Sequence, residues 1–223
     1  MRPLHFPIDV PFNFLIETCC LLFSIVYLRK ERRNYWHSLI WFMLAICLFE
    51  GTGWLIRITG GNNHWLYNFE MLLEVGFTGW LLNKIYQPIF NGKSWIISGF
   101  IIFLITYVVE TIIRVKNSQY GIYNNISNIE SAILFIIASG YYYYLLLKDE
   151  AYINLLRHPP FWLISGLFIF FFGSTVASTF FKELLSIHIT KGIPIRFFVF
   201  IMLNGILYGC WIYAFKCKYR QTI

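Results

Sequence analysis

The chain has 223 residues, with 18 Lys and Arg against 11 Asp and Glu, which gives a formal net charge of +7. Hydrophobic residues make up 58% of it and charged residues only 13%, whereas charged residues are about 25% of an ordinary soluble domain. This composition excludes a disordered chain, and a soluble domain built from it would expose too much apolar surface. The basic residues flank apolar stretches, so we expect no nucleic-acid partner. The sequence predicts a protein embedded in a lipid bilayer.

Seven runs of mostly apolar residues are long enough to cross a bilayer as helices, which takes about 20 residues each. We therefore predict an all-α, polytopic membrane protein with seven transmembrane helices, forming a single domain over residues 1–223. No linker or separate soluble domain is expected. The predicted spans are 12–28, 35–56, 65–83, 95–113, 125–147, 160–181 and 195–215.

The basic residues predict the orientation of these spans. The loop after the first span reads Arg29-Lys30-Glu31-Arg32-Arg33, and loops on the same side of the membrane hold 11 of the 18 basic residues. Because positive loops stay in the cytoplasm, we predict the N-terminus outside and the C-terminus inside. The N-terminal residues do not resemble a cleaved signal peptide. The predicted location is the inner, cytoplasmic membrane of a bacterial cell.

Six of the 11 acidic residues fall inside predicted spans, and all six lie in the outer half. An intramembrane carboxylate costs a few kcal/mol and usually faces the interior of a bundle or a wet cavity. Five of the six share a level roughly 5–10 Å below the outer boundary, at 1.5 Å rise per residue, with the sixth one turn deeper. These acids are Glu17, Glu50, Glu70, Glu74, Glu110 and Glu130. We predict an acid-rich, outward-facing cavity that closes inward.

Other polar residues accompany these acids in the predicted ligand-binding set. Two carboxylates one turn apart on one helix face, Glu70 and Glu74, are predicted to form the floor, and the other four acids the walls. The remaining members are Arg57, Arg114 and Arg196 as counter-ions at the mouth, with Asn128, Ser174 and Ser178 as polar lining. The alternative is that Glu110 pairs with Arg114, and Glu50 with Arg57, as local ion pairs.

The sequence gives little support for a metal or a cofactor. The weak metal candidates are Glu70, Glu74 and His64, because carboxylates with one imidazole suit a hard or borderline cation. No two histidines have a metal-ligand spacing. Retinal is excluded because the seventh span has Asn204 near its middle, and Lys216 lies at its inner end. We expect no cofactor.

These features favour a receptor-like or sensory protein that binds a small polar or cationic ligand and signals through a partner. One alternative is a proton- or cation-coupled transporter, which a polar channel to the inner face would favour. Another is a membrane-embedded enzyme using paired carboxylates, which a bound metal or a serine hydrogen-bonded to an acid would favour. The spacings Gly173-x-x-x-Ala177 and Gly205-x-x-x-Gly209 predict close helix packing.

Three stretches carry a resemblance: Asn128-Ile-Glu-Ser131, then Tyr141-Tyr-Tyr-Tyr-Leu-Leu-Leu147, then Pro159-Pro-Phe-Trp-Leu-Ile-Ser-Gly166. They resemble a group of uncharacterised small bacterial seven-helix proteins, similar in architecture to sensory modules associated with histidine kinases. The resemblance covers about the last two-fifths of the chain and implies no established ligand. It implies a sensor kinase or another signalling protein as a partner.

Overall fold

The computed structural model describes residues 12–31, 34–87, 93–117, 122–148, 154–180, 189 and 194–222. Within these ranges the chain is all-α, as predicted. It forms α1 (Phe12–Leu28), α2 (Asn34–Ile58), α3 (His64–Tyr86), α4 (Lys93–Lys116), α5 (Asn125–Lys148), the short 3₁₀ helix η1 (Leu155–Arg157), α6 (Pro159–Thr179) and α8 (Ile195–Thr222). Each predicted span corresponds to one α-helix. Only the last is much longer than expected, because α8 continues to Thr222.

Five helices of the described chain, α2, α4, α5, α6 and α8, are long and apolar enough to cross a membrane. This supports a multi-pass protein in a lipid bilayer. Of the other two, α1 is apolar but has only 17 residues. The remaining helix, α3, is long enough at 23 residues but carries Glu70, Glu74 and Lys84.

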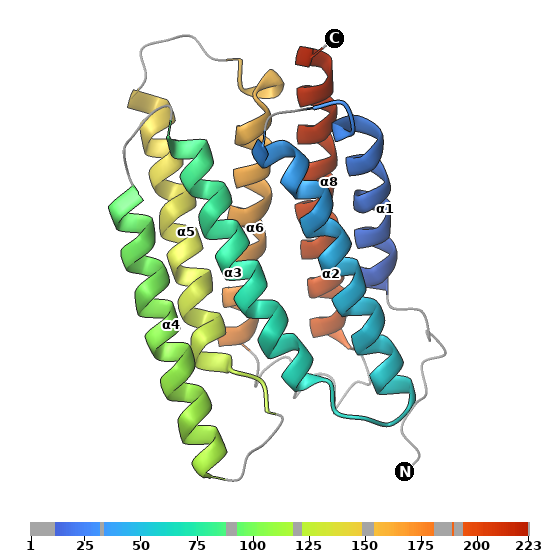
Figure 1. The fold of residues 1–223 in the computed structure, drawn as a ribbon, viewed down its shortest axis with the longest axis vertical. Helices are drawn as coiled ribbons and strands as arrows, with labels where there is room; N and C mark the ends of the chain where they lie inside the picture. The colour runs from blue at the N-terminus through green and yellow to red at the C-terminus, as the bar shows by residue number, and fades with distance from the viewer. Residues whose placement is uncertain are drawn as a thin grey trace.

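The helices run up and down alternately in a bundle (Figure 1). Around the bundle, α1 packs between α2 and α8, α6 packs between α8 and α5, and α3 contacts α2 and α5. The remaining helix, α4, packs on the outside against α3 and α5. The first three helices therefore share one interior with α8, although α8 lies far from them in sequence.

Glycine allows α6 and α8 to approach closely. A Cβ added at Gly166 would lie 3.0 Å from the Leu207 carbonyl oxygen and 3.1 Å from the Cys210 Cβ, and one added at Gly173 would overlap the Leu203 side chain. Gly166 and Gly173 therefore lie on one packing face. This contact is backbone to backbone at its tightest point.

The second small-residue spacing does not pack within the chain. Gly205 and Gly209 on α8 are exposed, and an added Cβ at either would meet nothing within 4 Å. The prediction of close packing at this pair is wrong for the described structure. The reason is that spacing alone places two glycines on one helix face without saying whether that face looks inward.

The end of the bundle where α8 finishes is tied together by polar contacts. Lys218 forms an ion pair with Glu31, N to O 3.1 Å, just after α1. The Gln221 amide donates to the Arg157 carbonyl at 2.9 Å. The His158 Nε2 lies 3.0 Å from the Tyr142 hydroxyl, so the segment before α6 is fastened to α5 as well.

Candidate functional site

Four of the six predicted acids come together inside the bundle. Glu17 on α1 is acted on electrostatically by Glu50 on α2 and by Glu70 and Glu74 on α3, and Glu70 by Glu74 and Glu50. We call these four residues the carboxylate cluster. Carboxyl groups gathered in a low-dielectric interior are stable when they are protonated or when a cation pairs with them.

Glu17 is the most enclosed member of the cluster. Glu17 is only 4% exposed, and its Oε2 atom is buried without a hydrogen-bond partner. The Tyr208 hydroxyl of α8 lies within hydrogen-bonding reach of the carboxyl group. A buried carboxylate oxygen without a partner is rare in folded proteins and calls for an explanation, such as a bound ion.

Glu70 and Glu74 are both half-buried on α3. Protein atoms surround both side chains, yet both keep surface that water can reach. Neither carboxylate accepts a hydrogen bond from the described residues, so both are available to a ligand. Tyr67 lies on the same face of α3, at the i, i+3, i+7 spacing that Tyr67, Glu70 and Glu74 form.

A tyrosine joins α2 to α3 beside the cluster. The Tyr67 hydroxyl donates a hydrogen bond of 2.8 Å to Glu50 Oε2. Gly53 makes room for it, because an added Cβ there would lie 2.7 Å from the hydroxyl. The Asn63 amide also donates to the Gly53 carbonyl at 3.0 Å. In contrast, a Cβ at Gly51 would make only ordinary contact, 3.4 Å from the Phe14 ring.

Aromatic rings of α2, α3 and α8 contact one another one to two helical turns from Glu50, Glu74 and Tyr208. Phe42 of α2 stacks on Phe77 of α3, with ring centroids 4.0 Å apart and 6° between the planes. Trp211 of α8 lies 6.0 Å from Phe42 and edge-on to Tyr208 at 6.2 Å. Phe77 is one turn beyond Glu74 towards the end of α3, and Trp211 is one turn beyond Tyr208 towards the end of α8. These rings lie between the cluster and the end of the bundle at which α3 and α8 finish.

Glu17 lies level with the middle of α8. Tyr208 is 13 residues after Ile195, where α8 begins, which corresponds to about 20 Å along the helix. Glu17, which Tyr208 reaches, is therefore near the middle of α8.

Glu110 has a different role from the predicted cavity wall. Its carboxylate accepts hydrogen bonds from the Ser127 backbone N–H at 2.9 Å, the Ser127 hydroxyl at 2.7 Å and the Ile126 N–H at 3.2 Å. It also pairs with Arg114 at 2.8 Å, as in the alternative interpretation. Glu110 therefore caps the N-terminus of α5 from the neighbouring helix α4. Its two oxygens are fully occupied.

The contact between Ser127 and Glu110 is a serine hydrogen-bonded to an acid, the feature that would favour an enzyme. Ser127 is 0% exposed, however, and the acid is already shared between Arg114 and the helix end. A nucleophile needs access to its substrate and a base that is free to accept its proton. We therefore interpret this pair as a helix cap.

Asn128 is connected to the cluster through Tyr123. Its side-chain oxygen accepts a 3.1 Å hydrogen bond from the Tyr123 hydroxyl, and Tyr123 is within electrostatic reach of Glu74 and Glu70. The segment before α5 is held by Asn68 of α3, whose side chain donates to the Ile122 carbonyl at 3.0 Å and accepts from the Asn124 N–H at 2.9 Å.

Two of the three predicted counter-ions, Arg57 and Arg196, lie at exposed positions, whereas Arg114 is half-buried and pairs with Glu110. Arg57 is exposed and acts electrostatically on Tyr67, at the Glu50 side of the cluster. Arg196 is exposed at the start of α8, with its guanidinium 5.4 Å from the Phe200 ring centre. Of the three, Arg57 is the one linked to the carboxylate cluster, through its electrostatic effect on Tyr67.

The predicted serines and the last acid are not brought into the cluster. Ser174 donates to the carbonyl of Phe171 in its own helix at 3.0 Å, and Ser178 is half-buried near the end of α6. Glu130 is half-buried on α5, and its Oε2 is buried without a partner. It is not among the carboxylates that act on Glu17 or Glu70.

The metal candidates do not form a compact ligand set. In the described ranges, no group of three His, Cys, Asp or Glu residues is placed to hold one metal ion. His64 is exposed at the start of α3, away from the buried end of the cluster.

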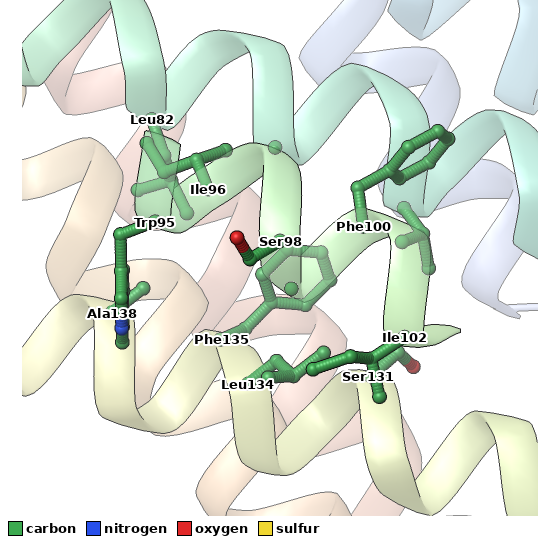
Figure 2. A pocket seen from close by; sticks show the side chains of 13 residues that line it. Leu82, Trp95, Ile96, Ser98, Phe100, Ile102, Ser131, Leu134, Phe135 and Ala138 are labelled. Carbon is green, nitrogen blue, oxygen red and sulfur yellow. The ribbon is translucent and has the colours of Figure 1, made fainter. Parts of the chain in front are cut away.

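A cavity of about 150 Å³ lies between α3, α4 and α5 and is a separate feature (Figure 2). Trp95, Ile96 and Phe100 of α4 face Leu134 and Phe135 of α5 across it. None of its lining residues is acidic. Its character is apolar, so it differs from the acid-rich cavity that the sequence predicts.

Comparison of the chain with family models, curated proteins and solved structures finds no match. The site is therefore interpreted from its own residues. Sequence reasoning missed three tyrosines, Tyr67, Tyr123 and Tyr208. The helical spacing of Tyr67 from Glu70 and Glu74 could have indicated that Tyr67 lies at the site. No feature of the sequence indicates that α8, which carries Tyr208, packs against α1.

Proposed function

We propose that this protein is a receptor-like, sensory membrane protein that binds a small cationic ligand at the carboxylate cluster. The observation that carries the proposal is the buried, unpartnered Oε2 of Glu17 among three other carboxylates. A cation bound there would give Oε2 of Glu17 a partner and offset repulsion among the carboxylates. Tyr208 and Tyr67 then act as positioning residues for the carboxylates.

The proposal includes seven spans, with α1 and α3 crossing the membrane beside the five apolar helices. At 1.5 Å per residue, α1 is about 26 Å long and α3 about 35 Å, against a hydrocarbon core of about 30 Å. The lower apolarity of α3 follows from the acids of the site itself. The basic loop after α1 supports a cytoplasmic position for that end, so the cluster opens to the outside of the bacterial inner membrane.

Sensing is favoured over transport by the aromatic rings beyond the cluster. The stacked Phe42 and Phe77, together with Trp211, stand between the cluster and the end of the bundle that we assign to the cytoplasm. A transporter would need a second arrangement in which these rings part. The resemblance to seven-helix sensory modules is the reason for placing the signal output in a partner protein.

The test measures the thermal unfolding of the full chain in lipid nanodiscs with Ca²⁺, putrescine or spermidine at constant ionic strength. A ligand that binds only the folded state raises its stability by about 2.7 kcal/mol at 100 times its Kd. We expect saturable stabilisation that is lost in Glu70→Gln and in Glu74→Gln. Glu130→Gln is the matched control, because it removes a half-buried acid outside the cluster, and it should keep the effect.

The proposal fails if none of these cations stabilises the wild-type protein, or if the effect persists in both cluster variants. Uptake of the stabilising cation into proteoliposomes separates sensing from transport. We expect no uptake above that of empty liposomes. Uptake that Glu74→Gln abolishes would replace the receptor proposal by the transporter.

A further inference from the structure

The cavity between α3, α4 and α5 is elongated along the helices. Its lining residues lie in the ranges 75–82 of α3, 95–102 of α4 and 131–138 of α5. In each range the last residue is seven positions after the first, which corresponds to about 10 Å along a helix. Figure 2 shows Trp95 at one end of the cavity and Ile102 at the other. The cavity therefore follows about two turns of each helix, beginning near the start of α4.

Two glycines leave room half-way along the cavity. Gly79 of α3 and Gly99 of α4 are both lining residues. A Cβ added at Gly79 would lie 3.9 Å from the Ile96 side chain, and one added at Gly99 would lie 3.7 Å from the Leu134 side chain. These are ordinary contacts with other residues of the lining. A larger side chain at either glycine would therefore occupy the cavity.

The cavity opens along α4. Its lining residues Trp95, Ser98 and Ile102 are exposed, and their i, i+3, i+7 spacing places them on one face of that helix. Two of the walls, α4 and α5, are apolar enough to cross a membrane, and α4 packs on the outside of the bundle. The opening therefore borders the hydrocarbon of the bilayer.

Aromatic rings surround the end of the cavity near the start of α4. The Trp95 ring lies 6.2 Å from the ring of Tyr141 on α5, and Tyr141 stacks on Tyr144 at 6.0 Å. Trp95 and Tyr144 are exposed. Because Trp and Tyr are enriched where lipid headgroups meet the hydrocarbon, this end of the cavity lies at headgroup level. Ile102 lies about 10 Å deeper in the bilayer.

The chemistry of the lining selects an apolar occupant. None of these lining residues is charged, and the Ser131 hydroxyl already donates to the Asn128 carbonyl at 2.9 Å. An apolar cavity of about 150 Å³ stays dry and accepts apolar molecules. Lipid chains are the apolar molecules that the surrounding bilayer supplies, and they lie along the same direction as the cavity.

We infer that this cavity binds one acyl chain of a membrane phospholipid, in the leaflet at which α3 ends and α4 begins. The headgroup lies beside Trp95 and Tyr141, and the part of the chain nearest to it passes Gly79 and Gly99 towards Ile102. The chain fills the space between α4 and the rest of the bundle. Recognition is by the chain and is independent of the headgroup, because the lining offers no charge to a phosphate. The site is separate from the carboxylate cluster, so this inference does not rest on the proposed function.

The experiment uses native mass spectrometry of the full chain in detergent to measure the affinity for the first bound molecule of palmitoyl-oleoyl-phosphatidylglycerol or palmitoyl-oleoyl-phosphatidylcholine. Gly99→Leu and Gly79→Leu place a leucine in the cavity. Gly140→Leu is the matched control, because an added Cβ on that part of α5 would meet nothing within 4 Å. We expect both cavity variants to bind either lipid about tenfold more weakly, the factor that about two buried methylene groups supply. Gly140→Leu should bind like the wild-type protein.

Photolabelling with a phosphatidylcholine that carries a diazirine on its acyl chain locates the chain in the wild-type protein, so the test does not depend on the folding of a variant. Phe135 lines the cavity and is only 5% exposed, whereas Ile101 and Ile105 are exposed on α4 and do not line it. We expect label on Phe135 as well as on the exposed isoleucines. Label confined to Ile101 and Ile105 would overturn the inference.

Three outcomes of the affinity measurement would also overturn it. The first is equal affinity in the wild-type protein and both cavity variants, and the second is an equal loss in Gly140→Leu. The third is a wild-type dimer that Gly99→Leu dissociates, since a second copy of the chain would then cover the cavity. Phosphatidylglycerol binding that is tighter than phosphatidylcholine binding and unchanged in Gly99→Leu would indicate a headgroup site elsewhere and would contradict recognition by the chain.

Discussion

Removing the Glu110 carboxylate should weaken the start of α5. In Glu110→Ala the backbone N–H groups of Ile126 and Ser127 lose their acceptor, and the loss of a helix cap costs about 0.5–2 kcal/mol. Arg114, whose side chain is 17% exposed, also loses its partner. Breaking a fully buried pair costs about 3–5 kcal/mol, so a partly exposed one contributes less.

Taken together, these losses predict that Glu110→Ala lowers the free energy of unfolding by about 2–4 kcal/mol. Glu110→Gln keeps the shape but puts an amide NH₂ against the donors of Ser127, and it should cost about 1–3 kcal/mol. Unfolding in a titration with SDS, followed by tryptophan fluorescence, measures both values. Hydrogen exchange at the Ile126 and Ser127 amides gives a local readout, and exchange should become faster.

Glu130→Gln is the comparison for this prediction, because Glu130 is a half-buried acid whose Oε2 has no partner. Its substitution should change stability by no more than about 0.5 kcal/mol, or increase it. If Glu110→Gln and Glu130→Gln have the same effect, and the amides of Ile126 and Ser127 exchange at the wild-type rate, the helix-cap interpretation is refuted.

Three further predictions follow from single contacts. Gly53→Ala should weaken cation binding, because its Cβ would displace the tyrosine bound to Glu50, whereas Gly51→Ala should leave the affinity measured by titration nearly unchanged. Gly166→Ala should destabilise the bundle by about 1–3 kcal/mol by overpacking, and Gly205→Ala should be neutral in the same unfolding assay because nothing lies near its added Cβ. Burial lowers the pKa of His158 below its usual 6.5, so the folded state favours the neutral ring. The stability that the neutral ring contributes is complete above pH 6.5 and is lost as the pH falls through the lowered pKa. The fall in melting temperature between pH 7.5 and 5 should therefore be smaller in His158→Asn than in the wild-type protein. An equal fall in the two proteins would contradict the lowered pKa of His158.

The helices were predictable because apolar composition over about 20 residues is a strong signal for a membrane helix. Each predicted span matches a helix of the described chain, with the largest difference at the end of α8. That end was missed because residues beyond 215 are more polar, including Lys216 and Lys218, although the helix continues through them. Their polarity marks the end of the apolar stretch but not the end of the helix.

The candidate site was predictable in part. Periodicity placed Glu70 and Glu74 on one face, and the cost of intramembrane charge predicted that acids on other helices, Glu17 and Glu50 among them, share one site with them. That these acids bind a ligand stays a prediction. The role of Glu110 depends on how the start of α5 folds against α4, which no periodicity reports. Tyr208 was missed because its position opposite Glu17 depends on the packing of α8 against α1.

Infrared difference spectroscopy of the carboxyl groups tests the central claim most directly. Addition of saturating spermidine to the full chain in nanodiscs should change the carboxyl stretching bands, since the ligand binds those groups. The account predicts that the change is reduced in Glu17→Gln and unaltered in Glu130→Gln. A spectrum that does not respond to spermidine, or responds equally in wild type and Glu17→Gln, would contradict a ligand bound to the buried carboxylate of Glu17.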